Sequence, residues 1–217
     1  MRTRVFLLIS IAVAAVVFFG ARMVNNDYVF FAGYTVLQFI VLATAWNILG
    51  GYTGYVNFGS AAFFAMGAYT TVFFHKAFPM PIPILIAIGG VVSGIVGLGM
   101  GYLTLRLKLV ATTISGSLMG MAGAPFPYYI GYLQPSSAFG LEYAVNSIAM
   151  PMIGGATSWV GPLIGAILLG SLQQIATVTI SSAVNLLIVG LLLVAFVIIA
   201  PNGIVGLVQG WMRRREK

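Results

Sequence analysis

Long apolar runs follow one another along the chain, and short polar or basic segments separate them. A membrane-spanning helix needs about 20 mostly apolar residues. The pattern therefore predicts an all-α, polytopic helical membrane protein with about eight membrane segments, one or two of them broken or re-entrant. We expect residues 1–217 to form a single transmembrane domain. The predicted segments are residues 5–20, 28–49, 61–74, 82–105, 109–129, 143–153, 159–180 and 184–200.

Two of these segments need comment. Residues 5–20 have the flanks of a signal peptide, but Phe-Phe-Gly-Ala-Arg-Met is a poor cleavage sequence, so we expect a retained span. Residues 143–153 are too few to cross a bilayer and are expected to dip into it. Pro125 and Pro127 are expected to bend or break the segment that holds them.

The stretch from Asn47 to Tyr69 is predicted not to be one smooth helix. A glycine inside a helix costs about 1 kcal/mol relative to alanine. Irregular polar backbone at membrane depth is tolerated only where protein or a water-filled cavity surrounds it, and broken helices often mark a transporter's substrate site. We therefore expect this stretch to line a passage. Its glycines and polar residues include Gly50, Gly51, Thr53, Gly54, Asn57, Gly59 and Ser60.

A similar phrase recurs later, since Ile153–Val160 echoes Leu49–Val56 in Gly-Gly, Thr and Val. One interpretation is a chance likeness in a glycine-rich chain; the other is two related halves that meet at a pathway. Helix N-termini after such breaks would offer free N–H groups to a substrate carboxylate. The alternative is that the glycines only permit close packing. The candidate pathway residues are Gly50, Gly51, Thr53, Asn57, Ser60, Gly154, Gly155 and Thr157.

Small residues also recur within residues 82–105. Gly90 and Gly94 are four residues apart, and Ser93, Gly97 and Gly101 repeat the same interval. Small side chains at this spacing let helices approach closely in lipid. We interpret them as packing positions.

Composition agrees with the membrane prediction. Of the 217 residues, 60% are hydrophobic and 6% are charged, whereas soluble domains carry about 25% charged residues. The net charge of +7 does not indicate nucleic-acid binding, because the basic residues lie at the ends of the predicted spans. The positive-inside rule places both termini in the cytoplasm. The residues expected inside are Arg2, Arg4, Arg106, Lys108, Arg213, Arg214, Arg215 and Lys217.

Catalytic chemistry is not evident in the sequence. Asp27, Glu142 and Glu216 are the only acids, and all lie in predicted loops or at the terminus. His75 is the only histidine and is interpreted as an interface residue beside Lys76. There is no cysteine and no phosphate-binding loop. We expect no enzyme activity, no cofactor and no metal, so any uphill transport must draw its energy from a partner.

Five blocks of sequence resemble the membrane subunits of bacterial branched-chain amino acid ABC importers, the LivH/LivM family, and most of all the LivM type. They extend in the family's order from about Asn47 to the C-terminus. The blocks are Gly51-Tyr-Thr-Gly54 with Asn57-Phe-Gly59, Ala61-Ala-Phe-Phe64 and Gly67-Ala-Tyr69; Leu103-Thr-Leu-Arg-Leu-Lys108; Ile114-Ser-Gly-Ser-Leu-Met-Gly-Met-Ala-Gly123; Met152-Ile-Gly-Gly155 with Gly161-Pro-Leu-Ile-Gly-Ala166; and Ala200-Pro-Asn-Gly-Ile-Val-Gly-Leu207.

The chain departs from the family pattern in two ways. Tyr55 stands where the family often has Gln, and Ser60 where it often has His. After Lys108 the family has further spans and a cytoplasmic coupling helix that docks on the ATPase. Here Lys108 leads almost directly into the next block, which looks like an internal deletion.

The resemblance implies a permease domain of an inner-membrane importer for branched-chain or related small amino acids. The implied partners are a second permease subunit, two cytoplasmic ATP-binding subunits, a periplasmic solute-binding protein and the lipid bilayer, with no nucleic acid. A coupling-deficient homologue that acts as a scaffold or partner subunit is the alternative. A passive channel is a third class, consistent with the lack of ionisable residues at depth.

Overall fold

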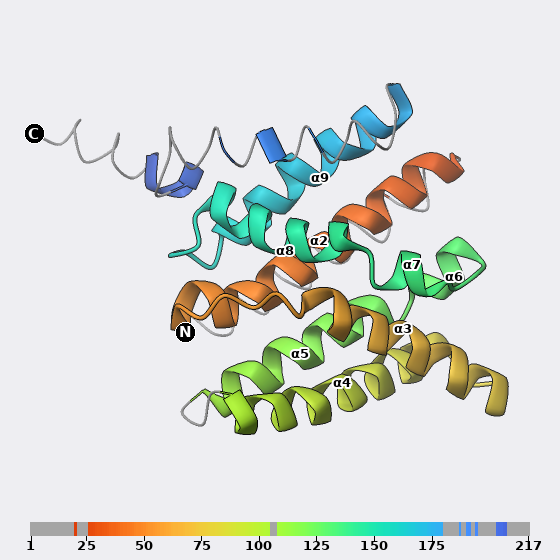
Figure 1. The fold of residues 1–217 in the computed structure, drawn as a ribbon. Coiled ribbons are helices and arrows are strands. Elements are labelled where there is room, and N and C mark those ends of the chain that lie inside the picture. The colour runs from red at the N-terminus through yellow and green to blue at the C-terminus, as the bar shows by residue number, and fades with distance from the viewer. Residues whose placement is uncertain are drawn as a thin grey trace, which may run out of the picture. The chain divides into compact units, whose positions relative to one another are not determined.

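The computed structural model describes residues 20, 26–104, 108–179, 187, 190–191, 194 and 203–207. Every regular element within them is a helix (Figure 1). The chain divides into two compact units, residues 1–35 and 36–217. The helices are α2 Asp27–Thr53, α3 Ser60–Ala77, α4 Ile82–Thr104, α5 Leu109–Gly123, α6 Phe126–Ile130, α7 Pro135–Ala138, α8 Leu141–Gly154 and α9 Gly161–Thr179.

The first unit contributes the start of α2. There the amide N–H of Tyr28 donates to Asn26 Oδ1 at 3.0 Å, and Thr35 Oγ1 donates to the Phe31 carbonyl at 3.0 Å. These contacts satisfy polar groups locally, as is usual near a helix N-terminus. All packing described below lies within the second unit.

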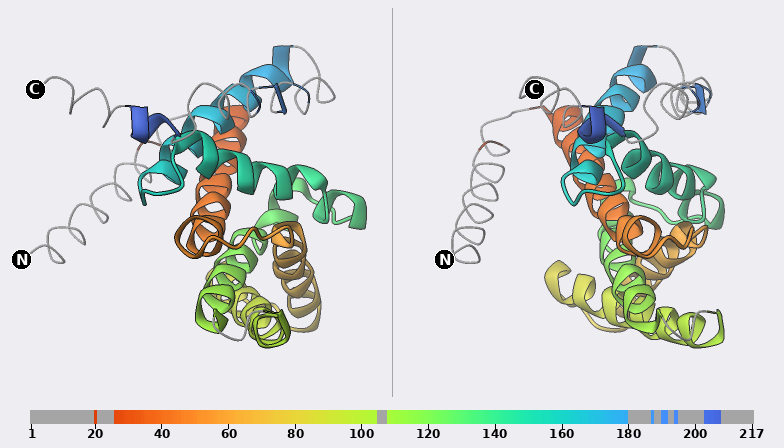
Figure 2. Two further views of the ribbon diagram at one scale, coloured as in Figure 1. Left: turned by 60° about the vertical axis from the view of Figure 1, so that its left-hand side comes forward. Right: turned by 90° about the vertical axis from the view of Figure 1, so that its left-hand side faces the viewer.

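Helices α3, α4 and α5 pack side by side, as two directions of view show (Figures 1 and 2). Glycine makes the approach possible. A Cβ on Gly67 of α3 would collide with the Gly120 carbonyl of α5, and a Cβ on Gly123 would collide with the Phe64 carbonyl. Backbones in membrane proteins come this close only where side chains are small. The spacing of small residues in α4 was correctly interpreted as packing, because Gly97 lies against Thr112 of α5.

Helices α8 and α9 form a second tightly packed pair. A Cβ on Gly165 of α9 would collide with the Met150 carbonyl of α8. Farther along the same two helices, Asn146 and Gln173 exchange two hydrogen bonds, of 3.3 Å and 2.8 Å, between side chains that are each 5% exposed. Both amides therefore find partners away from water, which a buried polar group requires.

We expect that Asn146→Leu lowers the free energy of unfolding by about 1–2 kcal/mol, because it leaves the Gln173 amide buried without its partner. The double variant with Gln173→Leu should recover much of that loss, since no polar group remains unpaired. Denaturant unfolding of the purified protein in detergent measures both. Strictly additive losses in the double variant would show that the pair is not coupled.

Three aromatic rings join the α3 layer to α8. Tyr143 of α8 stacks on Phe64 of α3 with ring centroids 4.1 Å apart, and Phe126 of α6 meets Phe64 edge-on at 5.2 Å. All three side chains are buried. Aromatic pairs at these separations add to the stability gained by burial, so this cluster fixes the short α6 segment against the longer helices.

The observed helices agree closely with the predicted segments. Among the described residues, three helical stretches have the length and hydropathy of a membrane span, namely Asp27–Thr53, Ile82–Leu103 and Leu109–Ile130, the last of which includes both α5 and α6. Gly161–Thr177 is a shorter apolar helix. Residues 5–19 of the first predicted segment and most of segment 184–200 lie outside the described residues. The total of eight segments therefore stays a prediction.

Two local predictions meet different outcomes. The break near the prolines is confirmed, because α5 ends at Gly123 and α6 begins at Phe126. The break expected at Gly50 and Gly51 was placed too early, because α2 continues through both to Thr53. The reason is packing. The Trp46 ring covers Gly50, and Gly51 lies against the Ala156 carbonyl of the loop between α8 and α9. These close contacts offset the poor helix propensity of glycine.

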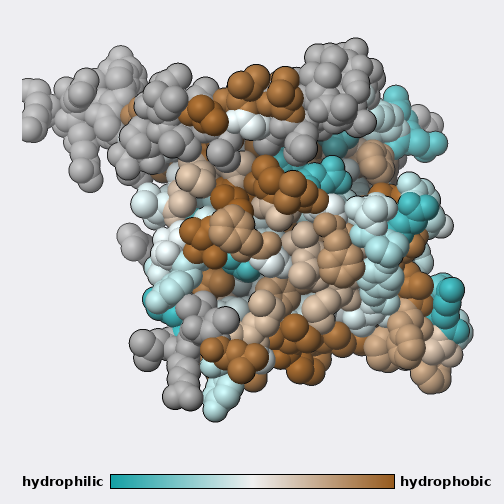
Figure 3. Space-filling model, viewed as in Figure 1, coloured by the Kyte–Doolittle hydropathy of each residue, from teal (hydrophilic) through white to brown (hydrophobic). Residues whose placement is uncertain are grey.

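The outer surface of α4 is apolar. Val91, Ile95 and Leu103 are 60%, 65% and 82% exposed, and hydrophobic side chains gather along the lower edge of the view in Figure 3, where α4 lies. An exposed apolar helix of this length is typical of a lipid-facing span.

Candidate functional site

The first break follows α2. The chain leaves the helix at Gly54, whose φ is +74°, a conformation that favours glycine. Thr53 Oγ1 donates to the Leu49 carbonyl at 2.6 Å, and the Tyr55 amide donates to the same carbonyl at 3.2 Å. The side chain of Thr53 is thus used locally to close the end of α2. The Tyr55 ring lies 5.8 Å from Lys108 Nζ, in a cation–π contact with the start of α5.

Asn57 organises the loop that leads into α3. Its Oδ1 accepts a hydrogen bond from the Gly59 amide at 2.8 Å, and its carbonyl accepts one from Trp46 Nε1 at 2.8 Å. Ser60 Oγ donates to the same carbonyl at 3.5 Å and is fully buried at the start of α3. The two polar residues therefore hold the loop in place, while Asn57 Nδ2 is buried with no hydrogen-bond partner.

The second break lies between α8 and α9. The chain turns at Gly155, whose φ is +117°, and the Ser158 amide donates to the Gly155 carbonyl at 3.2 Å. Ser158 Oγ accepts from the Val160 amide at 3.3 Å. Thr157 is exposed at the outside of this turn.

The structure brings the two breaks together. Asn47 Nδ2 of α2 donates to the Ser158 carbonyl at 3.4 Å. A Cβ on Gly51 would lie 2.5 Å from the Ala156 carbonyl, so the last turn of α2 lies directly against the second loop. The candidate residues of the two phrases, which are more than 100 positions apart in the sequence, therefore belong to one region.

The glycines of this region pack closely. A Cβ on Gly154 would collide with the Gly161 carbonyl, and a Cβ on Gly203 would collide with the backbone of Gly155. In the described state these glycines thus serve close contact between backbones. That they also line a passage stays a prediction.

Asn47 was not among the residues predicted for the site. Its side chain is 1% exposed, and its Oδ1 has no hydrogen-bond partner. The available signal was an amide within an otherwise apolar stretch of a predicted span, since polar side chains inside membrane helices are costly and usually functional. Two side-chain amide atoms near the first break therefore have no partner: Oδ1 of Asn47, near the end of α2, and Nδ2 of Asn57, in the loop after α2.

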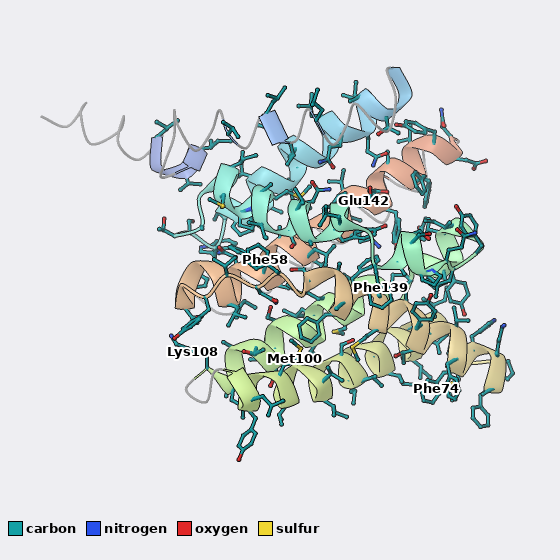
Figure 4. All side chains as sticks on the ribbon, viewed as in Figure 1. Phe58, Phe74, Met100, Lys108, Phe139 and Glu142 are labelled. Atoms are coloured by element: carbon teal, nitrogen blue, oxygen red, sulfur yellow. The ribbon has the colours of Figure 1, made fainter. Side chains whose placement is uncertain are left out.

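Figure 4 shows Phe58 in the loop between α2 and α3, on the side of the molecule that also carries Lys108. Phe58 is 75% exposed, and Trp159 of the second break is 64% exposed. Both breaks therefore present large aromatic side chains at the surface.

A family model described as branched-chain amino acid transport system / permease component matches residues 28–110 and 99–197. The chain belongs to this permease family. Together the two matches contain both breaks, α2 from its second residue, and every helix from α3 to α9. No curated protein and no solved structure matches the chain. Family membership and the apolar helices identify a membrane-embedded transport permease component.

Proposed function

We propose that this protein is a permease subunit of an ABC-type importer in a bacterial inner membrane. Its cargo is a branched-chain or related small amino acid. The observation that carries the proposal is the contact between the two breaks, through Asn47 and Ser158, inside the region that the family model matches. Broken helices that meet within a membrane domain are a recurrent way to build a solute site.

The proposed pathway is formed by the two breaks. In the described state the backbones are closed against each other, and two buried amide atoms have no partner. A buried polar group without a partner costs free energy, so separation of the breaks would be favoured by a solute that supplies the missing hydrogen bonds. A free amino acid, with its carboxylate and ammonium groups, has this chemistry. The mechanism is alternating access between two permease subunits.

A second permease subunit is the proposed lateral partner. Tyr55, Phe58 and Trp159, which surround the breaks, are 46%, 75% and 64% exposed. Large aromatic residues are enriched at the centres of protein interfaces. Two cytoplasmic ATP-binding subunits would supply the energy, and a periplasmic solute-binding protein would deliver the cargo.

A specific observation favours the alternative, a coupling-deficient homologue. The two family matches overlap at residues 99–110, where α4 and α5 are joined, and only residues 105–108 separate Thr104 from Leu109. This connection is too short for a cytoplasmic coupling helix, because even two helical turns need about seven residues. The homologue would keep the fold and the pairing without transmitting ATP-driven motion.

Affinity purification from the native membrane tests these two functions. We expect the tagged full chain to retain an ATP-binding subunit and a second permease. A tagged polytopic membrane protein of another family, isolated in the same way, is the control. Recovery of the chain alone would exclude the importer, and recovery of the second permease without the ATPase would establish the coupling-deficient homologue. Uptake by vesicles with ATP inside and binding protein outside separates an importer from a passive channel, which transports without ATP.

A further inference from the structure

The structure has an open hollow of about 410 Å³ far from the two breaks. It lies where the C-terminal half of α3 meets α6 and the segment after it. None of the candidate pathway residues lines it. Its walls include Thr71, His75, Lys76, Tyr128, Tyr132 and Leu133.

Thr71 lines the hollow and has an unused hydrogen-bond donor. Its side chain is 1% exposed, and its Oγ1 is buried with no hydrogen-bond partner. A threonine in a helix usually returns its hydroxyl to a carbonyl one turn earlier, as Thr113 does to Leu109 at 2.8 Å. Thr71 makes no such bond, although an unpaired buried hydroxyl is costly. Because Oγ1 is itself buried, a ligand phosphate would reach it only after the wall of the hollow shifts, and it would then supply the missing acceptor.

The other polar side chains of the hollow favour an anion. Tyr128 Oη lies 2.8 Å from His75 Nδ1, and when the hydroxyl donates this bond the other ring nitrogen of His75 carries a proton to donate. Lys76 adds an ammonium group. Among the described residues, those that line the hollow include one cationic side chain and several hydrogen-bond donors but no carboxylate. Phosphate oxygens are the acceptors that such a set binds best.

The hollow lies at a membrane face. Helices α4 and α5 are antiparallel, because Gly90 lies against Ser117 and Gly101 against Leu109, so the start of α4 and the end of α5 lie at the same face. Lys76 precedes the first of these ends, and Tyr132 follows the second. In Figure 4, Phe74 marks this end of α3, and Lys108 lies at the opposite end of the packed helices. Tyrosine and lysine are typical of the level at which lipid headgroups lie.

We propose that this hollow is a binding site for the phosphate of a phospholipid headgroup. The Lys76 ammonium and the Thr71 hydroxyl bind phosphate oxygens, and the hydrogen-bonded His75 and Tyr128 form the adjoining wall. The rings and the Leu133 side chain contact the apolar part of the lipid. The open side of the hollow and its level in the bilayer favour a lipid over a dissolved anion. The site is independent of the proposed transport pathway.

Binding titrations on the purified full chain in detergent test the site. The probes are a short-chain phosphatidylglycerol, the matching diacylglycerol without phosphate, inorganic phosphate, and leucine. We expect saturable binding of phosphatidylglycerol and none of diacylglycerol. Equal binding of the two lipids would overturn the proposal, because the phosphate would then not be recognised. Binding of inorganic phosphate or leucine in preference to phosphatidylglycerol would also overturn it, in favour of a dissolved anion.

Two variants with matched controls locate the binding. Lys76→Gln should weaken phosphatidylglycerol binding at least about tenfold, because it removes a charge-assisted contact. Lys108→Gln, which removes the same charge at the other end of the helices, should not. Thr71→Val should weaken binding about fivefold and yet leave the melting temperature of the ligand-free protein equal or higher, since the unpaired hydroxyl is gone. Thr113→Val, which removes a bonded hydroxyl, should leave binding unchanged. Unchanged binding in Thr71→Val or Lys76→Gln would overturn the proposal.

Discussion

Gly67→Ala is expected to lower the free energy of unfolding by about 3 kcal/mol or more, enough to prevent stable folding. A Cβ at this position would collide with the backbone carbonyl of Gly120 where α3 crosses α5. A flexible side chain could turn away, but a backbone carbonyl moves only if a helix moves. Overpacking of this kind is among the most costly single changes in a protein interior. The amount of monodisperse protein in detergent and its unfolding curve measure the effect.

Gly99→Ala is the matched control. It is the same substitution inside a helix of the same layer, and a Cβ on Gly99 would have nothing within 4 Å. Alanine favours helix over glycine by about 0.5–1 kcal/mol, so this variant should be as stable as the parent or slightly more stable. If both variants lose stability equally, the effect does not come from the helix crossing.

Much of the fold could be predicted because the bilayer imposes the pattern. Apolar runs separated by basic or polar residues fix the approximate bounds of α2, α4 and α9, and the prolines fix the break after α5. The four-residue spacing of Gly90 and Gly94 indicated a packed face. It did not indicate the partner, since any helix with small residues would fit such a face equally well.

The end of α2 shows where local reasoning fails. Intrinsic propensity argues against helix at Gly50 and Gly51, yet the Trp46 ring and the Ala156 carbonyl occupy the space that a side chain would fill. Tertiary contact therefore extends the helix to Thr53. No property of residues 47–54 alone reveals a contact that is made more than 100 positions later.

The sequence predicted that two segments belong together but did not predict all the residues that join them. The repeated Gly-Gly phrase led to two segments that do lie together. Asn47 and Thr71 were missed as site residues because an isolated amide or hydroxyl in an apolar helix looks like many others. Only the structure shows that Asn47 Oδ1 and Thr71 Oγ1 have no partner.

Asn47→Leu is expected to reduce ATP-driven uptake at least about tenfold while the protein remains folded. Leucine has the same number and branching of side-chain heavy atoms as asparagine. The change removes the bond to Ser158, but it also removes the unpaired Oδ1, so the free energy of unfolding should change by less than about 1 kcal/mol. Transport should fail because the polar link between the two breaks is lost. Uptake by reconstituted vesicles, with unfolding measured on the same preparation, tests both parts of the prediction.

Gln38→Leu on the same helix is the matched control. Gln38 is 5% exposed and its Nε2 donates to the Ala122 carbonyl of α5 at 3.2 Å, away from both breaks. This variant also replaces a buried amide of α2 with leucine, and its uptake should follow its stability alone. Normal uptake by the Asn47→Leu protein would exclude the breaks from the transport path. If instead Asn47→Leu blocks uptake and Gln38→Leu does not, the requirement lies with the amide that joins the breaks, because the two changes share their helix and their chemistry and differ in their neighbours.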